Sequence, residues 1–254
     1  MITRFLQRMV SSGYRRSCQR CNDWSGQRVA RLRPDSLLDV GCADGSFLFQ
    51  YLDYRPGRFC GIEASPVLKA AAEKRGMEVQ AVDLNGVWPY EDHSFEVVHC
   101  AQVIEHLHNT RLFGQEILRV LKPGGTALVT SENLTSFLNL GAMALGYTPF
   151  TLMRVCGWYL GNPLGLHYGE HVDEGVPITD PAFAGVTGHV RALSVLQAQE
   201  LFERVGFESV RASSLGLMPL PDWLGRRLEG WMKRRGHLLL IEARKPDHLP
   251  ACAT

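Results

Sequence analysis

The sequence lacks any continuous run of about eighteen apolar residues, the length that a membrane-spanning helix needs. It also lacks an excess of charge of either sign, because 27 basic and 26 acidic side chains leave a net charge of +1. A chain without a strong overall field does not attract nucleic acid by charge alone. Internal repeats and low-complexity tracts are absent as well. We therefore expect one globular domain, which at 254 residues is long enough to bury a sizeable core.

The cysteines do not have the spacing of a disulfide framework. Seven cysteines are scattered along the chain, and Cys60 and Cys100 lie inside apolar stretches that are typical of buried strands. This usage is typical of a reducing compartment, so we expect a cytoplasmic protein.

Acidic residues are absent from residues 1–22, which contain five arginines. Apolar residues recur on one side of this stretch, which favours a basic amphipathic helix in a leading segment of residues 1–33. The same composition also fits a transit peptide, which stays open as the alternative.

Glycine is missing where a dinucleotide-binding turn needs it. Residues 36–47 have the pattern of an apolar strand, a tight turn and the start of a helix. Counted from Gly41, alanine and serine replace the second and third glycines of G-x-G-x-x-G. The segment also holds Asp39 and Asp44, which would repel a pyrophosphate and attract a ligand with an ammonium and a sulfonium group. S-adenosylmethionine (SAM) is such a ligand.

Strand and helix patterns alternate from Leu37 to Val129, which is typical of right-handed βαβ units in a parallel sheet. The expected strands are residues 37–40, 58–62, 78–82, 95–100, 126–131, 208–213 and 237–243. The expected helices are residues 45–54, 66–75, 110–121 and 193–204. Residues 134–190 break the pattern, and we expect them to form an inserted lid or acceptor-pocket segment.

The D-x-G-C-x-x-G turn resembles the first motif of class I SAM-dependent methyltransferases. Four further segments follow in that family's order, at residues 59–63, 79–83, 94–107 and 118–129. The last of them resembles the subgroup that includes ubiquinone-pathway methyltransferases. The resemblance implies a Rossmann-like α/β fold, with a seven-stranded, mostly parallel sheet and helices on both faces, in one domain over residues 1–254. It also implies SAM as cofactor and S-adenosylhomocysteine as product.

The resemblance further implies which residues hold the cofactor. Glu63 ends the second strand, where an acid would bond the ribose hydroxyls, and Asp83 ends the third, where an acid would accept from the adenine amino group. Asp39 would organise the N–H groups of the turn. The full expected set is Asp39, Gly41, Cys42, Ala43, Asp44, Gly45, Glu63, Ala64, Asp83, Leu84, Ala101 and Gln102.

Three histidines are the expected catalytic residues. His189 stands just before the late helix, where the fold brings the chain near the methyl group, and a histidine can take a proton near neutral pH. His106 follows the fourth strand. His167 opens an H-x-x-E-H sequence, but the glycines and prolines around it predict a loop rather than the helix of a zinc peptidase.

His106 also ends a Q-x-x-E-H sequence that resembles the E-x-x-E-H cation site of small-RNA 3′-end methyltransferases. Here Gln102 replaces the first glutamate, and a neutral amide is a poor ligand for a hard cation. We therefore expect no metal ion.

We expect a SAM-dependent methyltransferase that acts on a small hydrophobic or aromatic acceptor, with O- or N-methylation favoured. The alternatives are a metal-assisted RNA 3′-end methyltransferase and a SAM-binding partner subunit without its own activity. Nucleic acid is not favoured as a partner, and the sequence does not fix the oligomeric state. Residues 221–235 form an aromatic and basic helical pattern that we expect to pack on its own domain, with peripheral membrane contact as the alternative.

Overall fold

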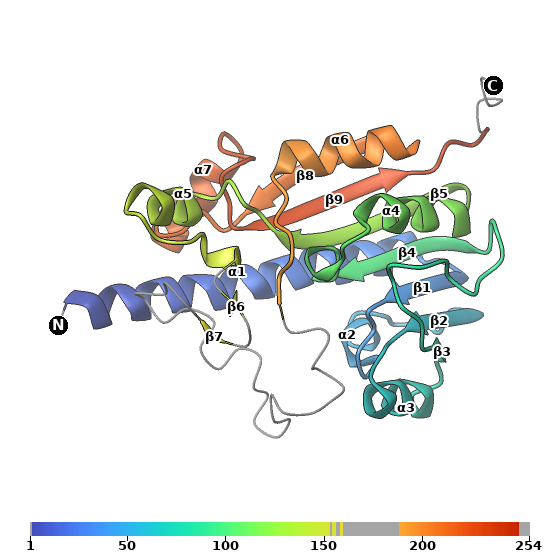
Figure 1. Ribbon diagram of the computed structural model, residues 1–254. Coiled ribbons are helices and arrows are strands. Elements are labelled where there is room, and N and C mark those ends of the chain that lie inside the picture. Colours follow the sequence, from blue (N-terminus) through green and yellow to red (C-terminus); the bar gives the residue numbers. More distant parts are fainter. Residues whose placement is uncertain (1, 153, 156–157, 160–187, 249–254) are drawn as a thin grey trace.

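The computed structural model describes residues 2–152, 154–155, 158–159 and 188–248, and a seven-stranded sheet forms its centre (Figure 1). The strand order is β3-β2-β1-β4-β5-β9-β8. The strands are β1 (Ser36–Val40), β2 (Arg58–Ile62), β3 (Glu78–Gln80), β4 (Phe95–Ala101), β5 (Leu121–Glu132), β8 (Glu208–Leu215) and β9 (Leu238–Arg244). The five strands β1 to β5 are parallel to one another, and β9 is antiparallel to both β5 and β8. The predicted Rossmann-like fold class is confirmed.

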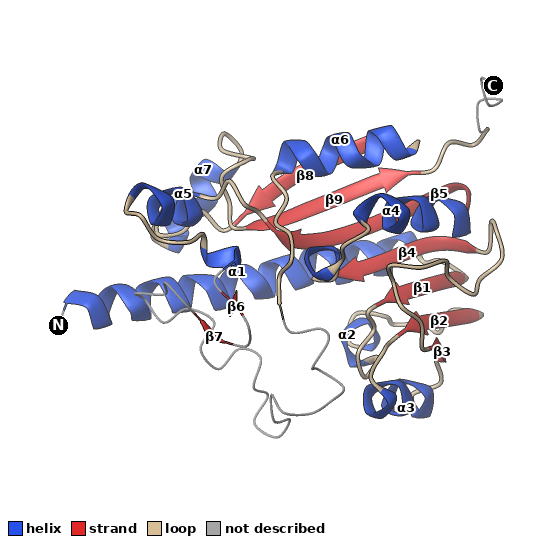
Figure 2. Ribbon diagram, viewed as in Figure 1, coloured by secondary structure: helices blue, strands red, loops and turns tan. Residues whose placement is uncertain are grey.

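Helices cover both faces of this sheet (Figure 2). They are α1 (Ile2–Leu32), α2 (Ser46–Phe49), α3 (Pro66–Lys74), α4 (Thr110–Val120), α5 (Phe137–Ala144), α6 (Val195–Val205) and α7 (Asp222–Glu229). Two 3₁₀ turns, η1 (Ile104–His106) and η2 (Phe150–Leu152), and a separate strand pair, β6 (Arg154–Val155) with β7 (Trp158–Tyr159), complete the described elements. The long helix α1 packs against β4, β5 and β9, whereas α4 and α6 pack on the other face.

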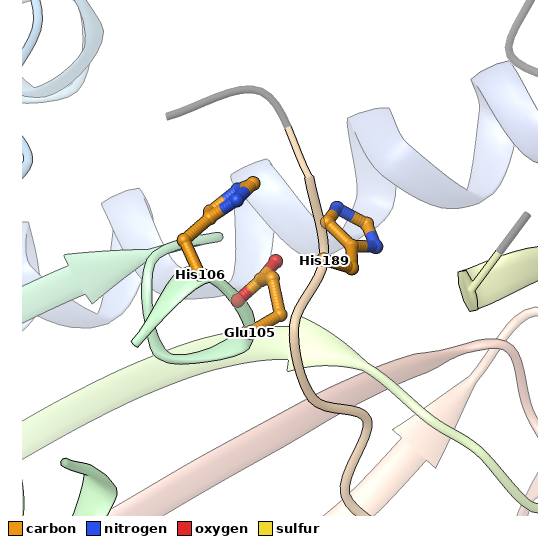
Figure 3. A group of neighbouring side chains, drawn as sticks. All are labelled: Glu105, His106 and His189. Carbon is orange, nitrogen blue, oxygen red and sulfur yellow. The ribbon is translucent and has the colours of Figure 1, made fainter. Parts of the chain in front are cut away.

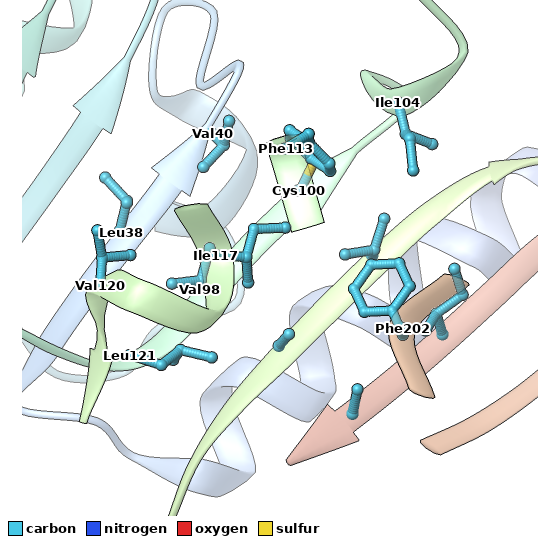
Figure 4. Packing of buried hydrophobic residues seen from close by; sticks show 14 of the residues in the cluster. Leu38, Val40, Val98, Cys100, Ile104, Phe113, Ile117, Val120, Leu121 and Phe202 are labelled. Carbon is cyan, nitrogen blue, oxygen red and sulfur yellow. The ribbon is translucent and has the colours of Figure 1, made fainter. Parts of the chain in front are cut away.

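Alternating apolar residues of the strands build a separate core on each face of the sheet. Leu38 joins Phe113 of α4 and Phe202 of α6 in the larger core (Figure 4). Its neighbour Leu37 points to the other face and joins Val29 of α1. Full burial of one such side chain contributes about 1.5–3 kcal/mol, so both faces help to fix the strand ends that carry the site.

Several elements differ from their expected bounds. The helix α2 ends at Phe49 and not at residue 54 as expected. The N–H of Tyr51 donates to the carbonyl of Leu48, three residues earlier, which forms a tight turn that does not continue the α-helix. The edge strand β3 ends at Gln80, since only Glu78–Gln80 pair with β2. The strand β5 begins at Leu121, because Phe95 pairs with it before a bulge that precedes the pairing of Val97 with Thr126.

The expected lid segment, residues 134–190, is described in part. Its start, α5 and η2, packs against α1 in a small core of Val10, Leu138, Ala142, Phe150 and Met218. Residues 160–187, including His167, lie outside the described residues. Within the described part of the chain, no helix is both long and apolar enough to cross a membrane.

Candidate active site

The turn between β1 and α2 is tight and needs its glycines. Gly41 has φ +72°, Gly45 has φ +78° and Ala43 between them has φ 49°, all in the left-handed region. A Cβ on Gly41 would lie 2.5 Å from Cγ2 of Val103. The N–H groups of Gly41 and Cys42 donate to the carbonyl of Ile62, which ties the turn to the end of β2.

Glu63 is the residue that organises this turn. Its Oε2 accepts the N–H of Ala43 at 3.0 Å, and its Oε1 accepts the N–H of Ser65 at 2.8 Å. These bonds fix a half-buried carboxylate at the end of β2. Each carboxylate oxygen has a second lone pair, so Glu63 can still accept from both hydroxyls of a ribose. The role of Glu63 in binding the ribose stays our prediction.

The structure corrects the role expected for Asp39. Its side chain lies inside β1 with 4% of its surface exposed, and its Oδ1 lies 2.7 Å from Nδ1 of His99 on β4. The two residues face each other because Asp39 pairs with His99 in the parallel register. The carboxylate therefore joins two central strands instead of binding the N–H groups of the turn.

The second acid of the turn, Asp44, is also engaged by the protein. Its Oδ1 accepts from the N–H and hydroxyl of Ser46, and its Oδ2 lies 3.0 Å from the guanidinium of Arg75. Burial acts to raise the pKa of Asp44, but the bonds from Ser46 and Arg75 outweigh it and lower that pKa. The attraction to a cation that we expected from Asp39 and Asp44 is therefore largely satisfied within the chain.

The other expected cofactor residues follow the ends of neighbouring strands. Asp83 is exposed three residues after β3, where its Oδ1 accepts from the backbone and the side-chain amide of Asn85. Ala64 and Leu84 lie next to Glu63 and Asp83 in the chain. Ala101 ends β4, and Gln102 donates its N–H to the carbonyl of Thr130. Because β1 to β5 are parallel, all of these positions lie at one edge of the sheet.

A cluster of one acid and two imidazoles lies at the same edge (Figure 3). Glu105 and His106 belong to η1 after β4, and His189 precedes α6. One nitrogen or oxygen atom of each side chain lies within 4.8 Å of the others. The two imidazole rings stand edge to face with centroids 4.9 Å apart. The structure thus brings together two of the three predicted catalytic histidines, while His167 lies outside the described residues.

Backbone carbonyls orient both rings. Nδ1 of His189 lies 2.7 Å from the carbonyl oxygen of Thr151, and Nδ1 of His106 lies 3.1 Å from that of Gly188. A carbonyl oxygen only accepts, so the Nδ1 of each ring carries a proton, and in the neutral form of His189 the Nε2 atom carries none. Glu105 is held by Ser131, whose hydroxyl donates to its Oε2 at 2.9 Å.

Sequence reasoning did not find Glu132, which lies beside His189, nor Tyr14 and His237, which contact Glu132. Oε2 of Glu132 lies 3.5 Å from Nδ1 of His189, and its Oε1 accepts from the hydroxyl of Tyr14 at 3.1 Å and lies 3.9 Å from Nε2 of His237. Glu132 ends β5, so the rule that singled out Glu63 at the end of β2 would also have found it. No pattern in the sequence links Tyr14 of α1 to this position.

Burial and charge shift the protonation of this cluster. Burial raises the pKa of Glu105 to about 7. Burial acts to lower the pKa of His189, but the hydrogen bond and charge of Glu132, with the charge of Glu105, outweigh it and raise that pKa to about 9. At neutral pH the imidazole of His189 is therefore protonated on both nitrogens and carries a positive charge, whereas Glu105 is partly ionised.

The spacing of Glu105, His106 and His189 is also one that a cation could occupy. The side chain of Gln102, which stands where the related cation sites have their first glutamate, donates to the hydroxyl of Thr130 at 3.4 Å. It is an amide engaged elsewhere, so the absence of a metal stays our prediction.

Comparison with known proteins identifies the domain to which this edge belongs. The sequence profile of the family described as 'Methyltransferase domain' matches residues 38–129, the region from β1 to β5. A SAM-dependent methyltransferase structure from Thermotoga maritima has the same fold, with a TM-score of 0.55 and 18% identity over 96% of this chain and 99% of that one.

Relatives in sequence match part of the chain. An uncharacterized methyltransferase of Mycobacteroides abscessus is 30% identical over 58% of this chain and 60% of its own length. A tRNA U34 carboxymethyltransferase of Desulfotalea psychrophila is 30% identical over 42% and 37%, and a ubiquinone biosynthesis O-methyltransferase of Idiomarina loihiensis is 29% identical over 44% and 51%. The chain thus spans less than two thirds of the length of these curated relatives. With the glycine turn, Glu63 and the strand order, these matches identify the region from β1 to β5 as a class I SAM-dependent methyltransferase domain, and SAM as its cofactor.

Proposed function

We propose that the protein methylates an oxygen or nitrogen atom of a small hydrophobic or aromatic acceptor. The observation that carries the proposal is the cluster of Glu105, His106 and His189, whose two rings are oriented by backbone carbonyls. It stands at the edge of the sheet that the carboxyl ends of β1 to β5 form, which we call the cofactor edge. When bound, SAM would supply a methyl group whose bond to the positively charged sulfur breaks readily, because the sulfur leaves as a neutral thioether. The protein then has to hold the acceptor in line, exclude water and accept a proton.

The cofactor end relies on a prepared surface. Gly41 and Gly45 have positive φ and no side chain, which gives the tight turn backbone that a ligand can approach closely. Glu63 is fixed by two N–H groups and keeps lone pairs for the ribose. Asp83 has an exposed carboxylate beyond β3 that is suited to an adenine amino group.

The acceptor end relies on His189 as the base. Thr151 holds its Nδ1 proton, so Nε2 is the atom that would take a proton from an acceptor hydroxyl or amine. The pKa of about 9 requires that His189 first lose its own proton, so turnover should rise with pH up to about 9. His106, with its ring against that of His189, is the second candidate for contact with the acceptor.

The small and apolar character of the acceptor rests on the segment that leads to the site. Residues 133–152 carry no charged side chain, and their end meets the site through the carbonyl of Thr151. The ubiquinone biosynthesis relative supports an apolar or aromatic acceptor, and the tRNA relative supports the nucleic-acid alternative. The net charge of +1 favours the former.

Substitution of His189 tests the proposal. Transfer of a labelled methyl group from SAM is measured on a panel of phenols, quinols and aromatic amines, with a short RNA as the competing acceptor. Loss of a general base lowers rates by about 10²–10⁴-fold, so we expect that fall for His189→Ala with SAM affinity almost unchanged. The matched control is His108→Ala, since His108 is exposed and is a near neighbour of His106 in the chain.

A structural role for His189 would give a different result. In that case His189→Ala would lower the melting temperature, and the protein that stayed folded would keep the turnover of the unchanged protein. Methyl transfer to RNA but to no small molecule would replace the proposed acceptor class, and transfer to neither would favour a partner subunit without activity.

A further inference from the structure

Two tryptophans at one end of the molecule are exposed. The helix α7 buries one of its faces, where Gly225 is buried and Leu224 and Leu228 are half-buried. The opposite face carries Trp223, which is 71% exposed, and the turn that follows carries Trp231, which is 92% exposed. The helix thus packs on its own domain, as expected, and still presents large aromatic side chains to solvent. Large apolar side chains that are exposed close together often mark a contact with a protein or a membrane.

Basic side chains stand beside both tryptophans. Residues three and four apart share one face of a helix, so Arg226 and Arg227 lie next to Trp223. Lys233 and Arg234 follow Trp231 in the turn, and all four basic residues are exposed. The tryptophan surface is defined as Trp223, Arg226, Arg227, Trp231, Lys233 and Arg234.

Positive charge is concentrated here in a chain that is almost neutral. Residues 221–236 contain five basic and two acidic residues, whereas the whole chain has a net charge of +1. One acid, Glu229, turns toward α1 and pairs with Arg20 at 2.5 Å. The other, Asp222, pairs with Arg226 at 3.0 Å. The charge that remains on the tryptophan surface is positive.

The neighbouring elements extend the same character. The N–H of Phe137 at the start of α5 donates to the carbonyl of Arg235, so α5 lies against the turn that carries Trp231. The far end of α5 exposes Met143 by 44%, and Leu145, which follows it, by 76%. The N-terminal half of α1, with its exposed Arg8 and Arg15, reaches the same end of the molecule (Figure 1).

We propose that the tryptophan surface docks the protein onto a membrane of anionic phospholipid. Indole rings favour the boundary between headgroups and acyl chains. Arginine and lysine near the surface are attracted to anionic headgroups, and a helix with both features lies in the plane of the interface. A second copy of this chain is a poorer partner, because two positive surfaces would repel each other. The docking does not depend on the identity of the methyl acceptor.

Sedimentation of the full chain with vesicles tests the proposal. We expect binding to vesicles of phosphatidylcholine mixed with phosphatidylglycerol, weak binding to phosphatidylcholine alone, and release at high salt. The double variant Trp223→Ala with Trp231→Ala, and the charge variant Lys233→Glu with Arg234→Glu, should each lower the apparent affinity at least about tenfold.

Matched controls use residues that are also exposed but lie elsewhere. Val87→Ala with Leu196→Ala removes apolar surface, since Val87 is 72% and Leu196 is 50% exposed, and Arg111→Glu reverses an exposed charge on α4. Both controls should bind vesicles like the unchanged protein. Circular dichroism should show all variants folded.

Three results would overturn the proposal. The first is equal binding to neutral and anionic vesicles, or to neither. The second is a loss of binding in the controls as large as that in the two test variants. The third is a different occupant of the tryptophan surface. It would be seen as a dimer in sedimentation velocity, or as a complex with RNA, and the tryptophan substitutions would abolish that contact while vesicle binding persisted.

Discussion

Replacement of Glu105 by glutamine should make the protein more stable at alkaline pH. The side chain of Glu105 is buried, and its Oε1 has no hydrogen-bond partner among the residues that the structure describes. Burial raises the pKa of this carboxyl from 4.5 to about 7. The folded state therefore keeps the proton over a pH range in which the unfolded chain releases it. Glutamine has the same shape, can accept from Ser131 and carries no charge to bury.

The size of the effect follows from the shift. A pKa that is raised from 4.5 to about 7 corresponds, at 1.36 kcal/mol per unit, to about 3 kcal/mol. This contribution is fully present below pH 4.5 and is lost as the pH rises to about 7. Glu105→Gln should match the unchanged protein near pH 4.5 and exceed its free energy of unfolding by up to about 3 kcal/mol at pH 8. The gain is an upper value, because the charge of Glu105 also helps to hold the proton on His189.

Urea unfolding between pH 4.5 and 8, followed by circular dichroism, measures this difference. Glu116→Gln is the matched control, because Glu116 is equally buried but pairs with Arg119 at 2.7 Å and accepts the N–H of Trp88. It should destabilise the protein at pH 8, since it breaks a buried ion pair. A Glu105→Gln variant that is less stable than the unchanged protein at pH 8, or whose difference from it does not vary with pH, would refute the reasoning.

The remaining predictions concern the cofactor edge. Glu63→Ala should weaken SAM binding about tenfold to a hundredfold without unfolding the chain, because two charge-assisted bonds are lost, and calorimetry that gives an unchanged affinity would remove Glu63 from the site. Gly41→Ala should lower the free energy of unfolding by about 1–3 kcal/mol, through its positive φ and the clash with Val103, whereas Gly141→Ala, with nothing within 4 Å, should not destabilise the protein. Activity should survive dialysis against EDTA, since Gln102 replaces a carboxylate; a loss that magnesium or manganese restores would contradict this.

Most of the fold could be predicted from local pattern. The strands expected at 37–40 and 58–62 coincide with β1 and β2. A strand that is buried in a parallel sheet is a short apolar run between turn residues, and such a run can be recognised in the sequence. The bounds fail where pairing decides. The end of β3 at Gln80 depends on how far β2 extends, and the start of β5 depends on the partner that Phe95 finds.

The site could be predicted only where its residues follow strand ends. Glu63 stands after the end of β2, as expected, and its carboxylate accepts the N–H groups of Ala43 and Ser65. Its bonds to the ribose stay a prediction. For Asp39 we expected contacts with the N–H groups of its own turn. Its carboxylate instead contacts His99, which lies 60 residues away in sequence on β4, the neighbour of β1 in the sheet. The contact between Tyr14 and Glu132 spans 118 residues and depends on how α1 crosses the sheet, which no local pattern encodes.

The position of α1 has a consequence for the order in which the chain can assemble. This helix precedes the sheet in the chain, yet Arg20 pairs with Glu229 and Arg28 with Glu242, across separations of 209 and 214 residues. Cys21 packs among side chains of β8 and β9, which are synthesised long after α1. A helix that is synthesised before the sheet therefore reaches its final place only after β9 has been made. Such long separations slow folding, and the delay leaves the apolar side of α1 uncovered while the rest of the sheet is being made.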